Sequence, residues 1–280
     1  MPSPAPTSPR SPTATRRSSR LVLRFVALGY LALLLVMPVW LVAWRTFAGG
    51  FGPVWKALTT ADTIHAFRVT GIVALCTVVA NTVFGVGAAL LIVRHEFRGK
   101  RLLNAMIDLP LAVSPVVVGL ALILVYGRFE PVGGWLADHG VQMIFALPGM
   151  VLATVFVSLP LVVREVAPVL TEIGTDQEQA AWTLGAGRVQ TFRRVTLPAI
   201  RWALAYGVVL TLARALGEYG AVAVVSGRLV GKTQTVTLLV EQRFQNFDQT
   251  GAYAASFALA AIAVVTLVVI NLLRPKETEI

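Results

Sequence analysis

The sequence predicts an all-α integral membrane protein that crosses the bilayer about six times. Of its 280 residues, 56% are hydrophobic and only 14% are charged, whereas soluble domains carry about 25% charged residues. A helix that crosses a bilayer needs about 20 mostly apolar residues, and runs of this length recur along the chain. The alternation typical of membrane β-barrels is absent from the sequence. The class is therefore a helical membrane protein, with lipid covering much of its apolar surface.

Six apolar runs account for the expected spans. They are residues 21–44, 67–93, 102–126, 143–163, 202–225 and 252–273. Pro110 and Pro115 should kink or break the third run, and Pro148 and Pro160 lie near the two ends of the fourth. Neighbouring helices can satisfy the carbonyls that a proline frees inside a membrane, so both runs are kept as spans. Residues 1–20 are rich in Pro, Ser, Thr and Arg and are expected to form a disordered basic tail.

The distribution of basic residues orients these spans. The net charge is +10, which in a soluble chain would suggest a nucleic-acid partner. In short membrane loops the same excess fixes orientation and meets anionic lipid headgroups, so no nucleic-acid partner is expected. With both termini in the cytoplasm, 16 of the 24 lysines and arginines lie inside and seven outside. We therefore expect a multi-pass protein of the cell membrane with both ends cytoplasmic.

This arrangement leaves a long cytoplasmic loop over residues 164–201. Thr175 and Glu178 have the spacing of a capping box, so a short helix is expected over residues 176–184, with Gly185 and Gly187 ending it. Ala180, Ala181 and Leu184 would share one face of that helix. On physical grounds alone, docking into a groove of another protein and lying on the membrane surface are equally good interpretations.

A second short helix should follow in the same loop. Phe192 and Val195 lie three residues apart, on one side of it. Pro198 is expected to end the cytoplasmic part and to begin the fifth span.

The loop resembles the EAA signature of the permease subunits of bacterial ABC importers. That signature has Glu-Ala-Ala, then three residues, a glycine, nine residues, and an aliphatic residue followed by any residue and Leu-Pro. Residues 179–181 (Gln-Ala-Ala) precede Gly185 by this spacing, and residues 195–198 (Val-Thr-Leu-Pro) close it. Gln179 stands where the family usually has glutamate, and an acid lies one place earlier at Glu178.

The resemblance implies a type-1 ABC importer permease fold and a coupling role for the loop. The chain would divide into a tail (1–20), a first helix with an external segment (21–65), a permease core (66–274, coupling loop 165–200) and a second tail (275–280). A separate cytoplasmic ATPase dimer would dock on the loop, and this chain would have no ATPase site or cofactor of its own. The residues that the resemblance assigns to coupling are Glu178, Gln179, Ala180, Ala181, Leu184, Gly185, Ala186, Gly187, Leu197 and Pro198.

The fifth and sixth runs resemble one branch of that family. Residues 213–227, ARALGEYGAVAVVSG, are similar to permeases for sulfate, thiosulfate, molybdate or tungstate. The continuation over residues 231–260 is most similar to the W-type permease of sulfate/thiosulfate importers. The resemblance implies a sister permease of the T-type, or a second copy of this chain, and an external sulfate-binding protein. A molybdate or tungstate permease is the alternative.

Arg214, Glu218 and Tyr219 are candidates for the translocation path or gate. Arg214 and Glu218 lie four residues apart, hence on one face of a helix inside a span, and ionisable groups there are functional candidates by default. Arg214 would offset the charge of an anion, or the two would pair with each other or brace the partner permease. The external loop over residues 226–251 is either a contact for the binding protein or a re-entrant or solvated segment.

Other classes fit the sequence less well. Gly227 and Gly231-Lys232-Thr233 look like a phosphate-binding loop, but only three residues separate the glycines where that motif needs four. The single cysteine, Cys76, is expected to be a small buried hydrophobe without a metal site. A secondary transporter would show inverted internal repeats, and a scaffold would not need a coupling loop. No catalytic constellation is expected.

Overall fold

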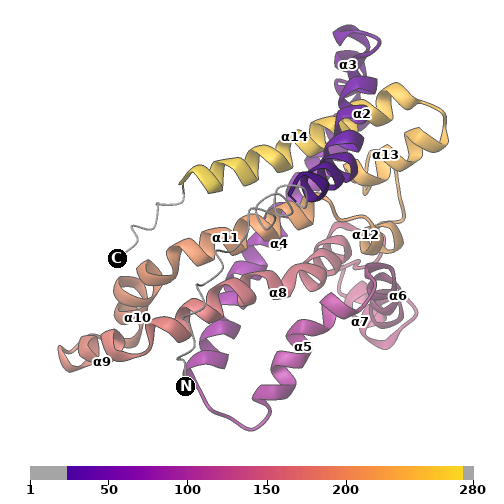
Figure 1. Ribbon diagram of the computed structural model, residues 1–280. Helices are drawn as coiled ribbons and strands as arrows, with labels where there is room; N and C mark the ends of the chain where they lie inside the picture. The colour runs from indigo at the N-terminus through magenta and orange to yellow at the C-terminus, as the bar shows by residue number, and fades with distance from the viewer. Residues whose placement is uncertain (1–23, 274–280) are drawn as a thin grey trace, which may run out of the picture.

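The computed structural model describes residues 24–273, and all regular structure in that range is helical (Figure 1). The elements in chain order are η1 (Ala32–Val36), α2 (Met37–Phe47), α3 (Phe51–Leu58), α4 (Ala61–Arg94), α5 (Lys100–Ala112), α6 (Pro115–Tyr126), α7 (Pro131–Asp138), α8 (Leu147–Ile173), α9 (Asp176–Thr183), α10 (Arg188–Thr191), η2 (Phe192–Thr196), α11 (Leu197–Leu216), α12 (Gly220–Val225), α13 (Val236–Gln245) and α14 (Gln249–Leu273). Both predicted tails, residues 1–20 and 275–280, lie outside the described residues.

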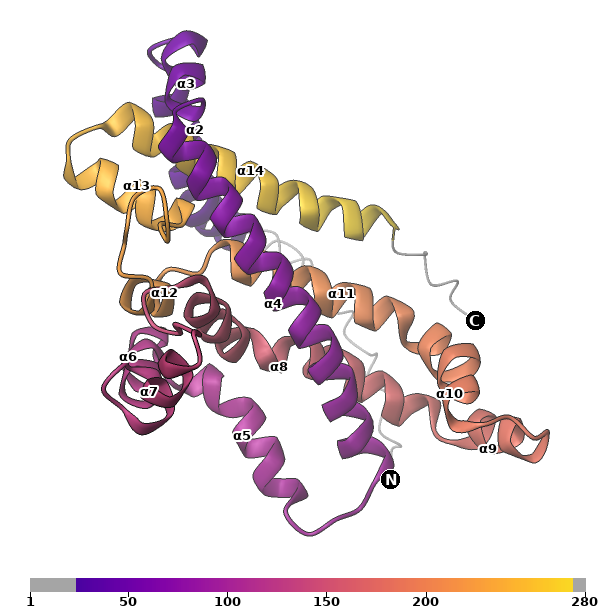
Figure 2. The same cartoon turned by 180° about the vertical axis from the view of Figure 1, so that it is seen from behind.

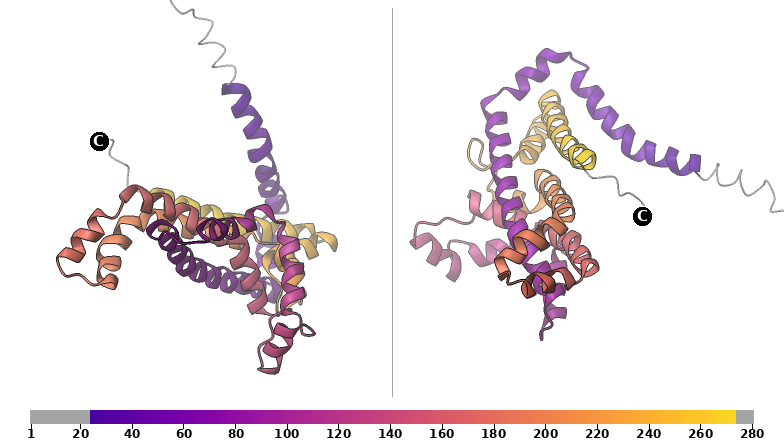
Figure 3. Two further views of the ribbon diagram at one scale, coloured as in Figure 1. Left: turned by 90° about the horizontal axis from the view of Figure 1, so that it is seen from below. Right: turned by 90° about the vertical axis from the view of Figure 1, so that its left-hand side faces the viewer.

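Five helices within this range are long and apolar enough to cross a membrane, or six when the bent pair α5–α6 is counted as one span. The predicted count of about six is confirmed. In the first of them, Arg24–Phe47, no residue of the most apolar stretch is buried against the rest of the chain. Figure 3 shows this helix projecting away from the other helices. Its apolar side chains therefore face lipid or another subunit.

Helices α4, α8 and α11 pack on one another and form the centre of the molecule. Val162 of α8 lies between two glycines, Gly85 of α4 and Gly207 of α11. A Cβ atom on Gly85 would meet the Val162 Cβ at 2.6 Å, and one on Gly207 would meet the Val162 Cα at 3.1 Å. Small residues let membrane helices approach closely. Such close packing matters there because lipid supplies no hydrophobic force that would hold the helices together. These glycines therefore set the spacing of the three helices.

Replacing Gly85 with valine should destabilise the permease, whereas the same change at Gly87 should not. Valine at position 85 forces α4 and α8 apart, and overpacking of this kind costs about 1–3 kcal/mol. Gly87, two residues further along α4, is exposed and has open space around its Cα. The measurement is the thermal unfolding midpoint of each variant in detergent. An equal midpoint for both variants would contradict this account of the packing.

The third predicted span is broken. The chain bends by 114° between helices α5 and α6. Pro110 is accommodated inside α5, whereas Pro115 is the first residue of α6. Proline has no N–H to donate and disfavours helical geometry in the residue before it. The predicted break is confirmed, and it falls at Pro115.

The fourth predicted span ends too early. Helix α8 contains Pro160 and Pro168 and continues past the expected end at residue 163 to Ile173. Val166 and Leu170 of this extension are fully buried, and such tertiary packing outweighs the cost of the prolines. The expected long loop is therefore mostly helical, and only Gly174 and Thr175 separate α8 from α9.

The fifth span also differs from its prediction. A continuous helical segment covers Arg188–Leu216, with the π-helical turn η2 just before Pro198. A π turn shifts the hydrogen-bond register, which accommodates the missing N–H of proline, so Pro198 does not end the helix. The span stops at Gly217 instead of residue 225, and α12 follows as a separate helix.

The structure bears on three further points, two in the external loop over residues 226–251 and one in α4. The external loop is not simply solvated, because α13 lies within it and buries Val236, Leu238 and Leu239. A helix rather than a strand precedes the sequence that looks like a phosphate-binding loop. Cys76 is exposed on α4 and not buried.

The helices define two ends of the molecule (Figure 2). Helices α9 and α10 lie at one end, beyond the ends of α8 and α11. Helices α6, α7, α12 and α13 gather at the opposite end. The two groups of candidate residues from the sequence therefore lie at opposite ends of the long helices.

Candidate coupling site and outer polar cluster

Helix α9 confirms the predicted short helix, but not its predicted cap. Thr175 occupies the N-cap without a side-chain capping hydrogen bond. The Gln179 side-chain amide donates to the Thr175 hydroxyl at 2.8 Å, and Glu178 points elsewhere. The capping box is therefore wrong, because the Glu178 carboxylate has stronger partners inside the protein.

The predicted glycine stop is present at the other end of α9. Gly185 has a φ of +84°, a left-handed conformation that only glycine adopts at little cost. The Ala186 N–H donates to the Ala181 carbonyl at 3.0 Å, and the Gly185 N–H to the Trp182 carbonyl at 2.9 Å. These bonds satisfy carbonyls that the helix end leaves free.

The outer surface of this segment carries large apolar side chains. The exposed fraction is 88% for Leu184, 50% for Trp182 and 72% for Val189. A groove of about 680 Å³ runs beside them between α9 and the start of α11. Its lining includes Gln177, Ala180, Ala181, Leu184, Arg194, Val195, Pro198 and Ala199. An apolar surface with a polar rim is typical of a protein interaction site.

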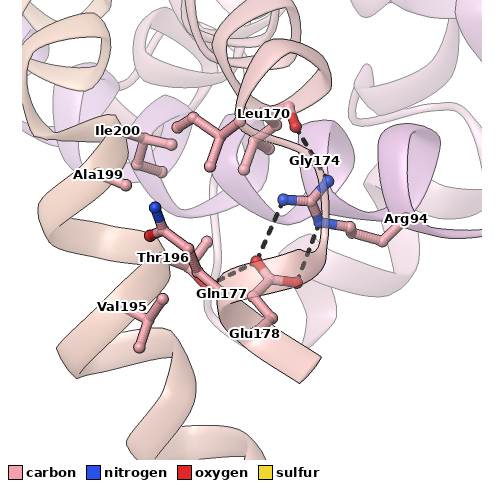
Figure 4. Close-up of a pocket in the computed structure, with 10 residues that line it drawn as sticks. Arg94, Leu170, Gly174, Gln177, Glu178, Val195, Thr196, Ala199 and Ile200 are labelled. Atoms are coloured by element: carbon pink, nitrogen blue, oxygen red, sulfur yellow. Dashed lines mark hydrogen bonds and ion pairs between the residues drawn. The ribbon is translucent and has the colours of Figure 1, made fainter. Parts of the chain in front are cut away.

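Glu178 lies on the inner side of α9 and pairs with Arg94, the last residue of α4 (Figure 4). The Arg94 Nε lies 3.1 Å from Glu178 Oε2, and the Arg94 Nη2 donates to Glu178 Oε1 at 3.2 Å. Arg94 Nη1 donates to the Leu170 carbonyl of α8 at 2.9 Å, and the Thr196 hydroxyl donates to Glu178 Oε1 at 2.8 Å. One ion pair thus joins α9 to α4, α8 and the start of α11.

The surroundings make this ion pair strong. Both side chains are only 11% exposed, and the neighbouring Leu170 and Ile200 are fully buried. The Arg94 Nη2–Glu178 Oε1 contact is a charge-assisted hydrogen bond, and such bonds are roughly twice as strong as neutral ones. The Leu170 carbonyl belongs to the last turn of α8, where a helix leaves its carbonyls free and favours a cation.

The outer polar cluster, at the end of the long helices opposite α9, consists of Arg214, Glu218, Tyr219, Arg228 and Glu241. It contains the other predicted residues. Arg214 Nη1 lies 2.7 Å from Glu218 Oε2, and the Glu218 side chain is 2% exposed against 38% for Arg214. The other carboxylate oxygen accepts the Ala221 N–H at 2.9 Å. Glu218 follows the end of α11, so the two residues do not share a continuous helix as expected. They do pair with each other.

Tyr219 belongs to the same cluster through residues that the sequence did not single out. The nearby carboxylate of Glu241 on α13 raises the pKa of the Tyr219 hydroxyl, and Arg228 Nη1 lies 3.0 Å from Glu241 Oε2. A cavity of about 380 Å³ lies beside Tyr219, lined mainly by Leu216, Val240, Leu259 and small residues. No local pattern pointed to Glu241, because its contact depends on the fold placing α13 beside Glu218 and Arg228.

No group of three or more His, Cys, Asp or Glu side chains between residues 24 and 273 is placed to hold a metal ion.

The fold and the coupling segment define a class of transport protein, and comparison with known proteins agrees. Residues 81–278 match the family of inner membrane components of binding-protein-dependent transport systems, and the chain belongs to that family. It is 48% identical over 251 residues to the sulfate transport system permease protein CysW of Synechocystis sp., covering 90% of this chain and 91% of that protein. These matches confirm the resemblance drawn from the coupling loop and the fifth span.

Two further matches concern the subunit type and the fold. The chain is 36% identical over 249 residues to the sulfate transport system permease protein CysT of Synechocystis sp., covering 89% of this chain and 87% of that protein. Its fold matches a crystal structure of a bacterial alginate ABC transporter in complex with an alginate-bound periplasmic protein. The TM-score is 0.76 at 17% identity, over 95% of this chain and 96% of that one. The predicted permease fold is confirmed.

Proposed function

We propose that this chain is the W-type permease subunit of an ATP-driven importer for sulfate and thiosulfate. The observation that supports this proposal most strongly is the coupling segment: a short helix, α9, exposes Trp182 and Leu184 at its end and is fixed to three long helices by a buried ion pair. A separate ATPase dimer would dock on α9, and closure of that dimer would move the long helices. The chain itself would hydrolyse no ATP.

The charge pattern supports a cytoplasmic position for α9. Arg94, Arg98, Lys100 and Arg101 lie between α4 and α5, at the end of α4 that meets α9. Basic residues are enriched in cytoplasmic loops. Both termini would then lie in the cytoplasm of the cell, and α12 and α13 would face the outside.

The relatives support the proposed partners. The chain resembles proteins named CysW and CysT, which supports pairing with a T-type sister permease, although a second copy of this chain is the alternative. The family description, binding-protein-dependent transport, supports an external sulfate-binding protein. The exposed end of α13, with Phe244 and Phe247, is the proposed contact for that protein.

The substrate assignment rests on the similarity to CysW and is tested by uptake. In a strain that lacks this gene, expression of the chain should restore uptake of radiolabelled sulfate. Excess unlabelled thiosulfate should compete, and molybdate or tungstate should not. Competition by molybdate would favour the alternative substrate class.

A crosslink tests the docking of the ATPase. In a Cys76→Ala background, a short thiol-reactive crosslinker should join the cysteine at position 181 of an Ala181→Cys variant to the co-purified ATPase subunit. ATP should change the yield of this crosslink. Phe129→Cys, 99% exposed between α6 and α7 at the other end, is the matched control and should give none. Absence of an ATP-sensitive crosslink at position 181 would count against the docking surface.

A further inference from the structure

Helix α9 is attached to the long helices mainly through one buried side chain. Its more extensive packing is with α10 and η2, the turns that follow it along the chain. Glu178 is the buried residue of α9 among those that the structure describes. Its carboxylate reaches Arg94 of α4 directly and Leu170 of α8 through the guanidinium of Arg94. A displacement of α9 therefore reaches α4 and α8 through this pair.

We propose that Arg94 and Glu178 are positioning residues that transmit the movement of α9 to α4, α8 and α11. This inference rests on the proposed function and adds a residue-level route to it. The Gln179 side chain stays on the exposed side of α9, bonded to Thr175, so it is placed to meet the ATPase. Glu178, one residue earlier, faces inward and serves the permease itself.

The chemistry of the pair suits a mechanical connection. Apolar contacts are non-directional, so α9 could slide over an apolar neighbour without moving it. Hydrogen bonds are directional, and Glu178 Oε1 accepts one from Arg94 Nη2 and one from the Thr196 hydroxyl. The remaining donor of Arg94 holds the end of α8, so one side chain orients two helices at once.

The third connection runs to the start of α11. The Thr196 hydroxyl donates to Glu178, and Thr196 is the last residue of the π turn η2. Single π turns within helices often mark functional sites. The ion pair therefore holds α11 at the place where its hydrogen-bond register changes.

The test uses the complete complex of permeases, ATPase and binding protein in proteoliposomes. Arg94→Met leaves the Glu178 carboxylate unpaired and lowers stability, but the outer face of α9 is unchanged, so the complexes that assemble should keep basal ATP hydrolysis near the wild-type level. The number of sulfate ions imported per ATP should fall about tenfold, a typical size for a lost coupling between sites. Glu178→Gln, which keeps the shape of the side chain, should give a smaller fall in the same ratio.

The matched control is Glu96→Gln. It breaks the Lys100–Glu96 pair, 2.6 Å long and with Glu96 88% exposed, near the same end of α4. This variant should keep the wild-type ratio. If Arg94→Met fails to assemble, Arg94→Cys and Glu178→Cys combined in the Cys76→Ala background replace it. A bifunctional methanethiosulfonate, which joins the two cysteines through disulfide bonds, should then restore the ratio, and reduction of those bonds should remove it again.

Two results would overturn the inference. One is a wild-type ratio in the assembled Arg94→Met complex. The other is a parallel loss of ATP hydrolysis and uptake, which would mean that the pair supports docking instead of transmission. A wild-type complex that shows no sulfate-stimulated ATP hydrolysis would instead reject the proposed function, so the two failures are distinguishable.

Discussion

Replacing Leu184 with aspartate should abolish ATP-driven uptake while the permease still folds and inserts. Leu184 is 88% exposed, and surface substitutions usually change stability by less than about 0.5 kcal/mol. If the side chain enters an apolar groove of the ATPase, the aspartate must lose its water there without a partner. Central interface residues of this kind are worth about 2 kcal/mol or more, roughly a thirtyfold loss of affinity. The measurement is the amount of ATPase that co-purifies per permease, together with uptake.

Two controls separate docking from general damage. Leu184→Met keeps an apolar side chain of similar volume and should retain uptake. Phe129→Asp adds the same charge at a position that is 99% exposed at the opposite end, and ATPase recovery should be normal. Normal recovery of the ATPase with Leu184→Asp would remove Leu184 from the proposed interface.

The sequence predicted the uniform spans well, because they need only lipid-compatible length. The run at 67–93 became α4, Ala61–Arg94, and the run at 252–273 became α14, Gln249–Leu273. Spans that contain proline were harder, since the outcome depends on neighbours. Pro168 continues a helix next to the fully buried Leu170, whereas Pro115 begins a new one. Hydropathy does not distinguish these two environments.

The coupling helix could be located from local signals, but the direction of its acid could not. Gly185 needs a left-handed φ, and this requirement is visible as a helix stop in the sequence. The inward turn of Glu178 depends on Arg94, which lies 84 residues away. A basic residue that ends an apolar run and an acid displaced by one place from the expected signature were the available signs. Neither sign specifies a contact between the two residues.

Replacing Arg214 with glutamine should reduce sulfate uptake strongly, because it strands a buried charge. The Glu218 side chain is 2% exposed and faces Arg214 at 2.7 Å. Removing one partner of a buried pair costs about 3–5 kcal/mol, and the 38% exposure of Arg214 places this case at the lower end. Glu218 also accepts the Ala221 N–H, so the strain would reach α12. Uptake is expected to fall about tenfold or more.

The double variant Arg214→Gln, Glu218→Gln decides what Arg214 does. If Arg214 serves to balance Glu218, removing both charges leaves no stranded carboxylate, and a glutamine at position 218 still accepts the Ala221 N–H. Most of the lost uptake should then return. We expect this result, because the guanidinium is held against Glu218 and the nearby cavity is lined mainly by apolar side chains. A double variant that transports as poorly as Arg214→Gln alone, with a raised KM for sulfate, would instead show that Arg214 meets the anion.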